Sequence, residues 1–179
     1  KLELTCSKRE CRKLLTANEL REELEEELRW RQEELAFFKN QLSNINSEED
    51  SCRYRKSLVF LLYSHFEGYV KIALQTYIKY LNSLSLHQRD VIPALAAAGM
   101  HKEFLAYENL DRKCSVFRTH LPDDTSLHRF YRRVDFIEQM DEFQNKILHL
   151  EDTLIDTESN LWYVVLQKNL SKLGLSITV

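Results

Sequence analysis

The chain has 179 residues, which suits a single domain with its own hydrophobic core, and its net charge is -3. Three glycines and two prolines are too few for the many tight turns of an all-β fold. The charge excludes a basic protein that binds nucleic acid through its whole surface, and no apolar run approaches the roughly 20 residues of a membrane span.

One long helix, or two nearly continuous ones, is predicted over about 7 to 43. Ser7 with Glu10 and Thr16 with Glu19 both fit the capping-box pattern of a helix start. Apolar residues recur there at heptad-like spacing, and Arg31 interrupts their stripe: Leu24, Leu28, Leu35, Phe38 and Leu42. Because the stripe spans barely three heptads, we expect it to pack within its own domain rather than in a coiled-coil dimer.

Charged residues cover the rest of this helix. Glu25 with Arg29 and Glu27 with Arg31 are predicted i,i+4 ion pairs. The acidic run 22–27 fits either a solvated outer face, which is the commoner explanation, or a surface for a basic partner.

A second long helix is predicted from about 48 to 82. Ser47 can cap it. The helix dipole is positive at this end and stabilises the negative charges of the first turn, which are Glu48, Glu49 and Asp50. Apolar residues cover most of its circumference, and the most apolar stretch is 58–66. A helix of this kind is expected to be central and contacted from several sides.

Three shorter helices complete the prediction. Pro93 favours a helix over 93–107, and a further helix is expected over 127–144 after a loop. Ser159 or Asn160 can cap a last helix through Leu173, with Gly174 just past its end. We therefore predict one all-α, up-and-down helical bundle over 1–179, with an N-terminal helical arm at 1–45 and a bundle core at 47–179.

Cysteine and histidine spacing argues against disulfides and metals. The four cysteines form no CxxC pair, so we expect reduced thiols in a cytoplasmic protein. The six histidines are scattered, and no phosphate-binding loop, HExxH or GxSxG motif is present. The sequence thus predicts neither a metal nor a cofactor.

Three polar residues interrupt the apolar second helix: His65, Glu67 and Lys71. Glu67 and Lys71 have the spacing of a favourable ion pair. Buried charges require partners, so this cluster is either a polar network between helices, which is the commoner case, or part of a functional site.

Three segments carry a family resemblance: RKSLVFLLYSHFEGYVK at 55–71, LHQRDVIPALAAAG at 86–99 and LIDTESNLWYVVLQKNLSKLGL at 154–175. In this order they resemble the signature helix, the middle helix and the TxSNL segment of the MAE-like branch of the HEPN superfamily. The resemblance implies a helical bundle, usually dimeric, that in many members cleaves RNA without metal through an Arg-x4-6-His motif. It also implies toxin-antitoxin or phage-defence systems, with a homodimer or larger complex and a cognate antitoxin as partners.

The chain departs from that pattern because it has no Arg-x4-6-His motif. The nearest spacings are Arg112 with His120, one residue too long, and QNKILH at 144–149, in which neutral Gln144 replaces the arginine. Asn145 and His149 are therefore the candidate catalytic residues. The alternatives, in order, are a catalytic helix that follows Val179, a non-catalytic HEPN domain, and a displaced site.

Local basic clusters supply candidate RNA contacts. Arg129, Arg132 and Arg133 lie beside Tyr131, an aromatic side chain on which a base can stack, although an ordinary solvated face has the same composition. The leading hypothesis is a metal-independent endoribonuclease, and the alternative is a non-catalytic helical scaffold in a defence complex.

Overall fold

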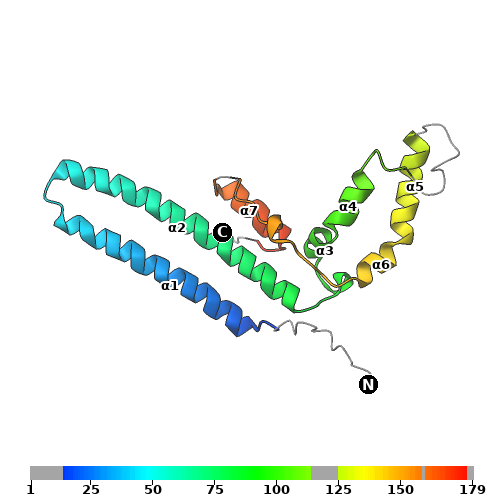
Figure 1. Cartoon of the computed structure of the whole chain (residues 1–179), viewed down its shortest axis with the longest axis horizontal. Coiled ribbons are helices and arrows are strands. Elements are labelled where there is room, and N and C mark those ends of the chain that lie inside the picture. The colour runs from blue at the N-terminus through cyan, green and yellow to red at the C-terminus, as the bar shows by residue number, and fades with distance from the viewer. Residues whose placement is uncertain (1–13, 114–124, 159, 177–179) are drawn as a thin grey trace, which may run out of the picture.

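The computed structural model describes residues 14–113, 125–158 and 160–176. Its main feature is a hairpin of two long antiparallel helices, α1 (Ala17–Gln41) and α2 (Glu48–Ser83), joined by the short 3-10 helix η1 (Leu42–Asn44) (Figure 1). Strands are absent from the described part of the chain. The predicted all-α bundle is therefore confirmed.

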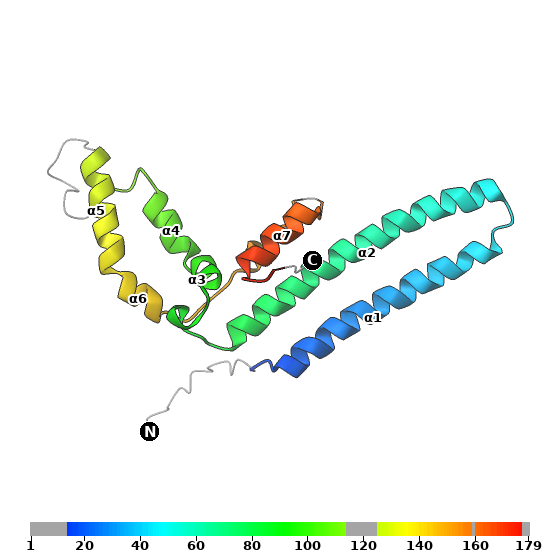
Figure 2. The same ribbon diagram turned by 180° about the vertical axis from the view of Figure 1, so that it is seen from behind.

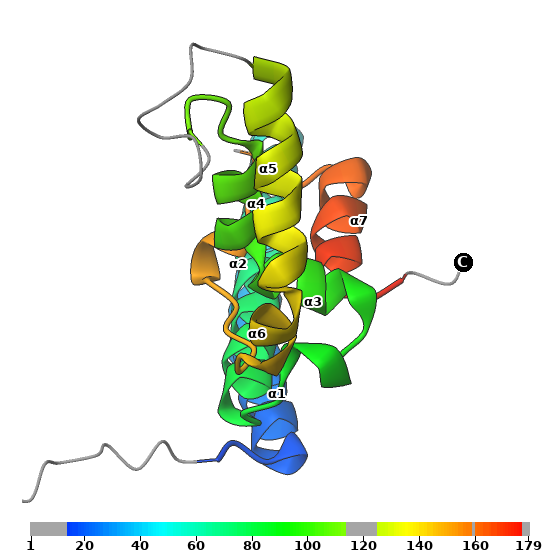
Figure 3. The same cartoon turned by 90° about the vertical axis from the view of Figure 1, so that its right-hand side faces the viewer.

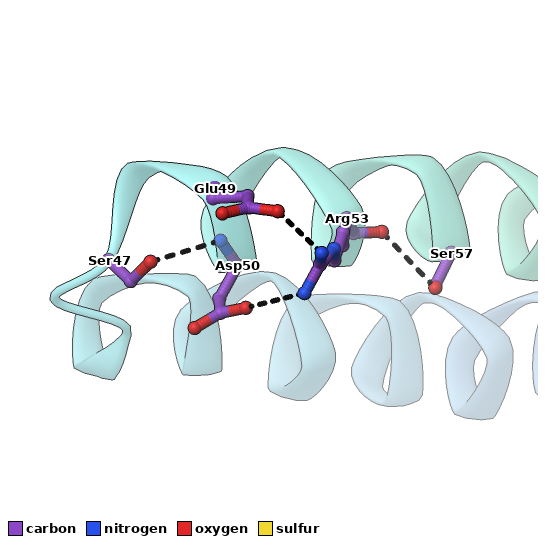
Figure 4. A network of polar contacts seen from close by, with 5 residues as sticks. All are labelled: Ser47, Glu49, Asp50, Arg53 and Ser57. Atoms are coloured by element: carbon purple, nitrogen blue, oxygen red, sulfur yellow. Dashed lines mark hydrogen bonds and ion pairs between the residues drawn. The ribbon is translucent and has the colours of Figure 1, made fainter.

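Local signals set the start of both long helices. Thr16 and Glu19 form the predicted capping box of α1, whereas the Ser7 and Glu10 pattern lies outside the described residues. Figure 4 shows the start of α2, where the Ser47 hydroxyl accepts a hydrogen bond from the backbone N–H of Asp50. Glu49 and Asp50 also pair with Arg53 in the first turns of the helix.

Most of the remaining helices gather at one end of the hairpin, whereas the last one lies back along it (Figure 2) and to one side of it (Figure 3). Two 3-10 helices, η2 (Gln88–Asp90) and η3 (Asp152–Leu154), lie in the connecting segments. The α-helices are α3 (Pro93–Gly99), α4 (His101–Glu108), α5 (Thr125–Glu138), α6 (Met140–Asn145) and α7 (Tyr163–Lys172). The helices predicted over 93–107 and 127–144 are thus each broken, at Met100 and at Gln139.

The start of α7 was predicted wrongly, and its end correctly. Trp162 is the N-cap residue and makes no side-chain cap. The side-chain oxygen of Asn160 accepts a hydrogen bond from the Tyr63 hydroxyl, and Ser159 lies outside the described residues. Gly174 follows the helix with φ of +69°, and a Cβ there would lie 1.9 Å from Cδ1 of Ile92. Glycine is therefore favoured at this position by its backbone angle, and a larger residue would also displace the end of the Ile92 side chain.

The core lies where the second half of α2 meets the other helices. Its buried side chains come from α2, α3, the segment after α6 and the end of α7: Leu74, Ile78, Leu81, Leu95, Leu148, Leu150, Ile155 and Leu173. Helix α2 is therefore central in its second half.

The expectation that α2 is contacted from several sides is wrong for its first half. Val59 is 65% exposed and Phe60 77% exposed, and Leu62 and Phe66 are exposed as well. Among the described residues α1 covers most of this half of the helix, with η1 at its start and residues 160–161 bonded to the Tyr63 hydroxyl. Hydrophobic periodicity identifies the apolar faces of a helix, but it does not show how far along those faces other helices pack.

Candidate functional site

Two segments far apart in the sequence are joined by backbone pairing next to the core. The N–H of Leu148 donates to the carbonyl of Leu86 at 2.7 Å, and the N–H of Gln88 donates to the carbonyl of Lys146 at 3.0 Å. His87 and Ile147 face each other in this antiparallel bridge. The start of η2 is thereby fixed beside the end of α6.

This pairing brings a guanidinium to a carboxamide. Nη1 of Arg89 donates a hydrogen bond to Oδ1 of Asn145 at 2.8 Å, while Nδ2 of Asn145 donates to the carbonyl of Asp141 at 2.7 Å. The two bonds fix the orientation of the Asn145 amide. Arg89 remains exposed, and its Nε lies 3.8 Å from Oδ1 of Asp90, within ion-pair distance.

His87 is the third member of the cluster. Its Nδ1 lies 2.7 Å from the carbonyl oxygen of Asn145. Because a carbonyl only accepts hydrogen bonds, Nδ1 carries the hydrogen, and Nε2 of the neutral ring is left as a proton acceptor. We call His87, Arg89 and Asn145 the polar trio.

The trio combines a fixed positive charge, a proton acceptor and an oriented amide. A guanidinium binds phosphate oxygens, and an imidazole accepts a proton near neutral pH. Among the described residues no group of three or more metal-ligating side chains occurs. The chemistry that this arrangement supports directly is proton transfer beside a stabilised anion.

A pocket of about 790 Å³ is lined by residues next to the trio in the sequence, but by none of the trio itself. Gln88, which lies between His87 and Arg89, and Lys146, which follows Asn145, both line it. The other walls come from α3, the start of α4, the segment 146–154 and the end of α7.

The structure separates the two residues of the QNKILH candidate. Asn145 is the last residue of α6, and the chain continues in an extended conformation, so the pair does not share a helical face. Asn145 belongs to the trio, whereas exposed His149 lines the pocket. His120, the partner proposed for Arg112, lies outside the described residues.

Sequence reasoning missed His87 and Arg89 as site residues. Both stand in the LHQRD segment, but they are 58 and 56 residues from Asn145, and no local spacing joins them to it. A search for a histidine and an arginine within one segment that resembles the family would have found them.

The cluster of His65, Glu67 and Lys71 is divided by the structure. His65 is buried against α1, where its Nε2 lies 3.3 Å from Oε2 of Glu34, within ion-pair distance but without hydrogen-bond geometry. Glu67 is partly buried, Lys71 is exposed, and in the described part of the chain no ion pair joins them.

Arg31 is the partner that α1 contributes to His65. It is buried between the long helices, donates to the carbonyl of His65 at 3.4 Å and pairs with Glu27 at 3.3 Å, which confirms the predicted Glu27 pair. Arg29 pairs with Glu26 rather than with Glu25. The predicted packing of α1 within its own domain is therefore confirmed.

The three basic candidates of α5 differ in their surroundings. Arg132 is only 5% exposed, and its Nη1 donates to the carbonyls of Leu110 and Arg112. Its guanidinium therefore holds the preceding loop in place. Arg129 and Arg133 are exposed, and Tyr131 is partly buried.

Comparison with known proteins agrees with this architecture. An all-α bundle built around a long helical hairpin is the fold expected of the HEPN class. Residues 26–179 match the RiboL-PSP-HEPN family, and the chain belongs to that family. No curated protein and no solved structure matches the chain. The MAE-like branch within the superfamily stays a prediction.

None of the described helices is long and apolar enough to cross a membrane.

Proposed function

We propose that this HEPN domain is a metal-independent endoribonuclease and that the polar trio is its reacting group. The observation that supports the proposal is the hydrogen bond between Arg89 and Asn145, with His87 on the carbonyl of the same asparagine. Gln144 cannot supply the positive charge that phosphate chemistry needs, and Arg89 brings that charge from another segment. The third sequence hypothesis, a displaced site, is thus favoured over a catalytic helix beyond Val179.

Each member of the trio has a role in this reaction. Nε2 of His87 takes the proton of a ribose 2′-hydroxyl, whose oxygen then forms a bond to the adjacent phosphorus. The bond from phosphorus to the 5′-oxygen breaks, and that oxygen receives the proton back from the imidazolium. The products are a 2′,3′-cyclic phosphate and a 5′-hydroxyl. The reaction uses the 2′-oxygen as nucleophile in place of water, and none of its steps requires a metal ion.

Arg89 stabilises the phosphate while charge accumulates on its oxygens. Nη1 of the guanidinium is engaged with Asn145 and Nε lies 3.8 Å from Oδ1 of Asp90, so the N–H groups of Nη2 are the donors left for a phosphate oxygen. Asn145 holds both partners through its side chain and its carbonyl, and it is a positioning residue.

A homodimer is part of the proposal, and the first half of α2 offers its surface. Val59, Tyr63 and Phe66 lie at i, i+4 and i+7, and the same stripe continues through Val70 into the buried core position Leu74. This face is exposed at Val59 and Phe66, whereas the Tyr63 hydroxyl between them is bonded to Asn160 and to the N–H of Leu161. Large exposed patches of this kind mark interaction sites.

Charge placement on this face favours a second copy of the chain. Lys56 lies four residues before Phe60, and Glu67 lies four residues after Tyr63. Two antiparallel copies of α2 that cross between Phe60 and Tyr63 bring Lys56 of each copy opposite Glu67 of the other. A two-fold contact makes each such pair twice.

The biological setting follows from the resemblance. A toxin or phage-defence effector that acts on RNA in the cytoplasm, held by a cognate antitoxin or within a larger complex, suits a small domain with these features. Arg129 and Arg133 are exposed enough to contact the RNA backbone.

The decisive experiment incubates the protein with tRNA or total RNA in EDTA. Cleavage that persists in EDTA and leaves 2′,3′-cyclic phosphate ends is the expected result. Absence of cleavage by both the full-length protein and its native complex contradicts the ribonuclease proposal.

The second candidate function is a non-catalytic interaction module. The exposed apolar half of α2 favours it, because such a surface binds a partner protein whether or not the trio reacts with RNA. A chain that forms a stable complex through this face and leaves RNA intact in EDTA fits this alternative.

A further inference from the structure

No member of the polar trio lines the 790 Å³ pocket, so its ligand need not be the substrate of the trio. The pocket falls within the roughly 300–1,000 Å³ of ordinary ligand sites, and its walls are largely apolar. One wall is the small-residue surface of α3, formed by Ala94, Ala97, Ala98 and Gly99. These residues carry no side chain beyond Cβ, so a large apolar group can lie against the helix.

The pocket lining carries more positive than negative charge, because it includes four lysines but only two carboxylates. Three of the lysines are engaged in ion pairs: Lys102 with Glu151 at 2.7 Å, Lys146 with Glu103 at 3.3 Å, and Lys168 with Glu158. The fourth lysine, Lys172, is therefore the one left to bind an anion.

Lys172 is held in the wall by one hydrogen bond. Its Nζ donates to the carbonyl of Leu154 at 2.8 Å, and no carboxylate within the described ranges pairs with it. An ammonium group has three N–H donors, so two remain after this bond. The residue is partly buried at the end of α7, and the pocket thus offers an anion one positioned cation.

Gln88 adds a buried polar group that lacks a partner. The residue is only 4% exposed, it lines the pocket, and its Oε1 makes no hydrogen bond. Its carboxamide lies against α3, since a Cβ at Gly99 would be 3.6 Å from Nε2 of Gln88. A buried acceptor without a donor costs free energy, so the pocket favours a ligand that brings an N–H group.

An anion, an N–H donor and an apolar body occur together at the carboxyl terminus of a peptide. Capture of a terminal carboxylate is a recurrent mode of peptide recognition. A peptide bond carries an N–H beside a carbonyl, so it can pair with the carboxamide of Gln88. A fatty acid has the same charge and an apolar body, but it has no N–H donor for Gln88.

We propose that this pocket binds the carboxyl terminus of a partner protein. The terminal carboxylate binds Lys172, and a backbone N–H of the peptide donates to Oε1 of Gln88. The last side chain is large and apolar, and it packs on the small-residue surface of α3. Binding of this kind requires neither RNA nor the polar trio, so it goes beyond the proposed ribonuclease.

The test measures binding of the peptide acetyl-Ala-Ala-Phe to the full chain by isothermal titration calorimetry. One matched probe is the same peptide with a terminal carboxamide, which lacks the charge, and the other is phenylpropionate, which lacks the peptide N–H groups. We expect saturable binding of the free acid, about tenfold tighter than that of either matched probe. No binding of the free acid, or equal binding by either matched probe, overturns the inference.

Variants of the two polar groups test how the peptide is placed. Lys172→Met should weaken binding of the free acid about tenfold, as expected for loss of a charged hydrogen bond, whereas Lys172→Arg should retain it. Gln88→Met should also weaken binding, but its melting temperature should not fall, because Oε1 makes no hydrogen bond within the protein. Wild-type affinity in either methionine variant overturns the proposed placement.

A further pair of variants keeps the test independent of the polar groups. Ala97 is exposed on α3, so Ala97→Leu fills the pocket without removing a core side chain, and Ala97→Ser is its matched control. Loss of peptide binding in the leucine variant alone is expected. Equal binding of the peptide by both variants contradicts its place in the pocket.

Discussion

Nη1 of Arg89 and Oδ1 of Asn145 are joined by a hydrogen bond of 2.8 Å between residues 56 positions apart in the sequence. In the QNKILH segment neutral Gln144 stands where an RNxxxH motif has its arginine. The bond to Asn145 brings the permanent positive charge of Arg89 to this segment instead. The backbone pairing of 86–88 with 146–148 holds this contact in place.

Removal of the Arg89 charge is predicted to slow RNA cleavage. Arg89→Ala should lower the rate on the order of 100-fold, because a charge that stabilises the phosphate in the transition state is lost. Thermal unfolding should change little, since Arg89 is exposed. Arg129→Ala, an exposed arginine on α5, is the matched control and should cleave much faster than Arg89→Ala.

The two histidines near the site are predicted to behave differently. His87→Ala should reduce cleavage by about 10²- to 10⁴-fold, the usual contribution of a general base, whereas His149→Ala should retain most activity. Single-turnover cleavage of one defined RNA measures both. If His149→Ala instead loses more cleavage activity than His87→Ala, the catalytic histidine is His149 of the QNKILH segment.

Charge exchange tests the dimer surface. Lys56→Glu and Glu67→Lys should each shift the protein toward monomer, because each places like charges opposite one another in two copies. The double variant restores opposite charges and should restore the dimer. Sedimentation equilibrium measures the three association constants, and a double variant weaker than both single ones argues against the antiparallel pairing.

The long helices were predictable because their signals are local. Ser47 and the acidic residues after it placed the start of α2 correctly at Glu48. The breaks at Met100 and Gln139 and the uncovered half of α2 depend on which elements meet, which the one-dimensional pattern does not contain. The trio was not predictable for the same reason, since backbone pairing brings Arg89 to Asn145.

Gly68 and Arg31 are predicted to be coupled. Alanine in a helix is favoured over glycine by about 1 kcal/mol, but a Cβ at position 68 would lie 3.0 Å from Nη1 of Arg31. Gly68→Ala should therefore stabilise the protein more in an Arg31→Ala background than in the wild-type chain. Urea unfolding of the four proteins gives the coupling, and equal effects in both backgrounds contradict it.

The ion pair of Lys102 and Glu151 predicts a pH dependence. The hydrogen bond from Lys102 lowers the pKa of the Glu151 carboxyl below its ordinary value of 4.5. The pair therefore contributes stability above about pH 4.5, and this contribution is lost as the pH falls through the lowered pKa. Both groups are exposed, so the effect is small.

The matched variant for this pair is Glu151→Gln. Melting temperatures of the wild-type chain and the variant should differ at pH 7 and converge near pH 3. A constant difference across that range contradicts the pair's role.

Helix α2 is unbroken, but the first half of its apolar stripe is largely exposed and the second half lies in the core. The hydrogen bonds of the two halves should therefore break independently in local unfolding. Local unfolding frees the amide hydrogens of a helix wherever tertiary contacts are few. In the monomer, hydrogen exchange should be faster over 50–62, which packs mainly on α1, than over 70–81, which reaches the core. A second copy seated on the first half should slow exchange there and leave the core half unchanged, so that one helix reports both folding and assembly.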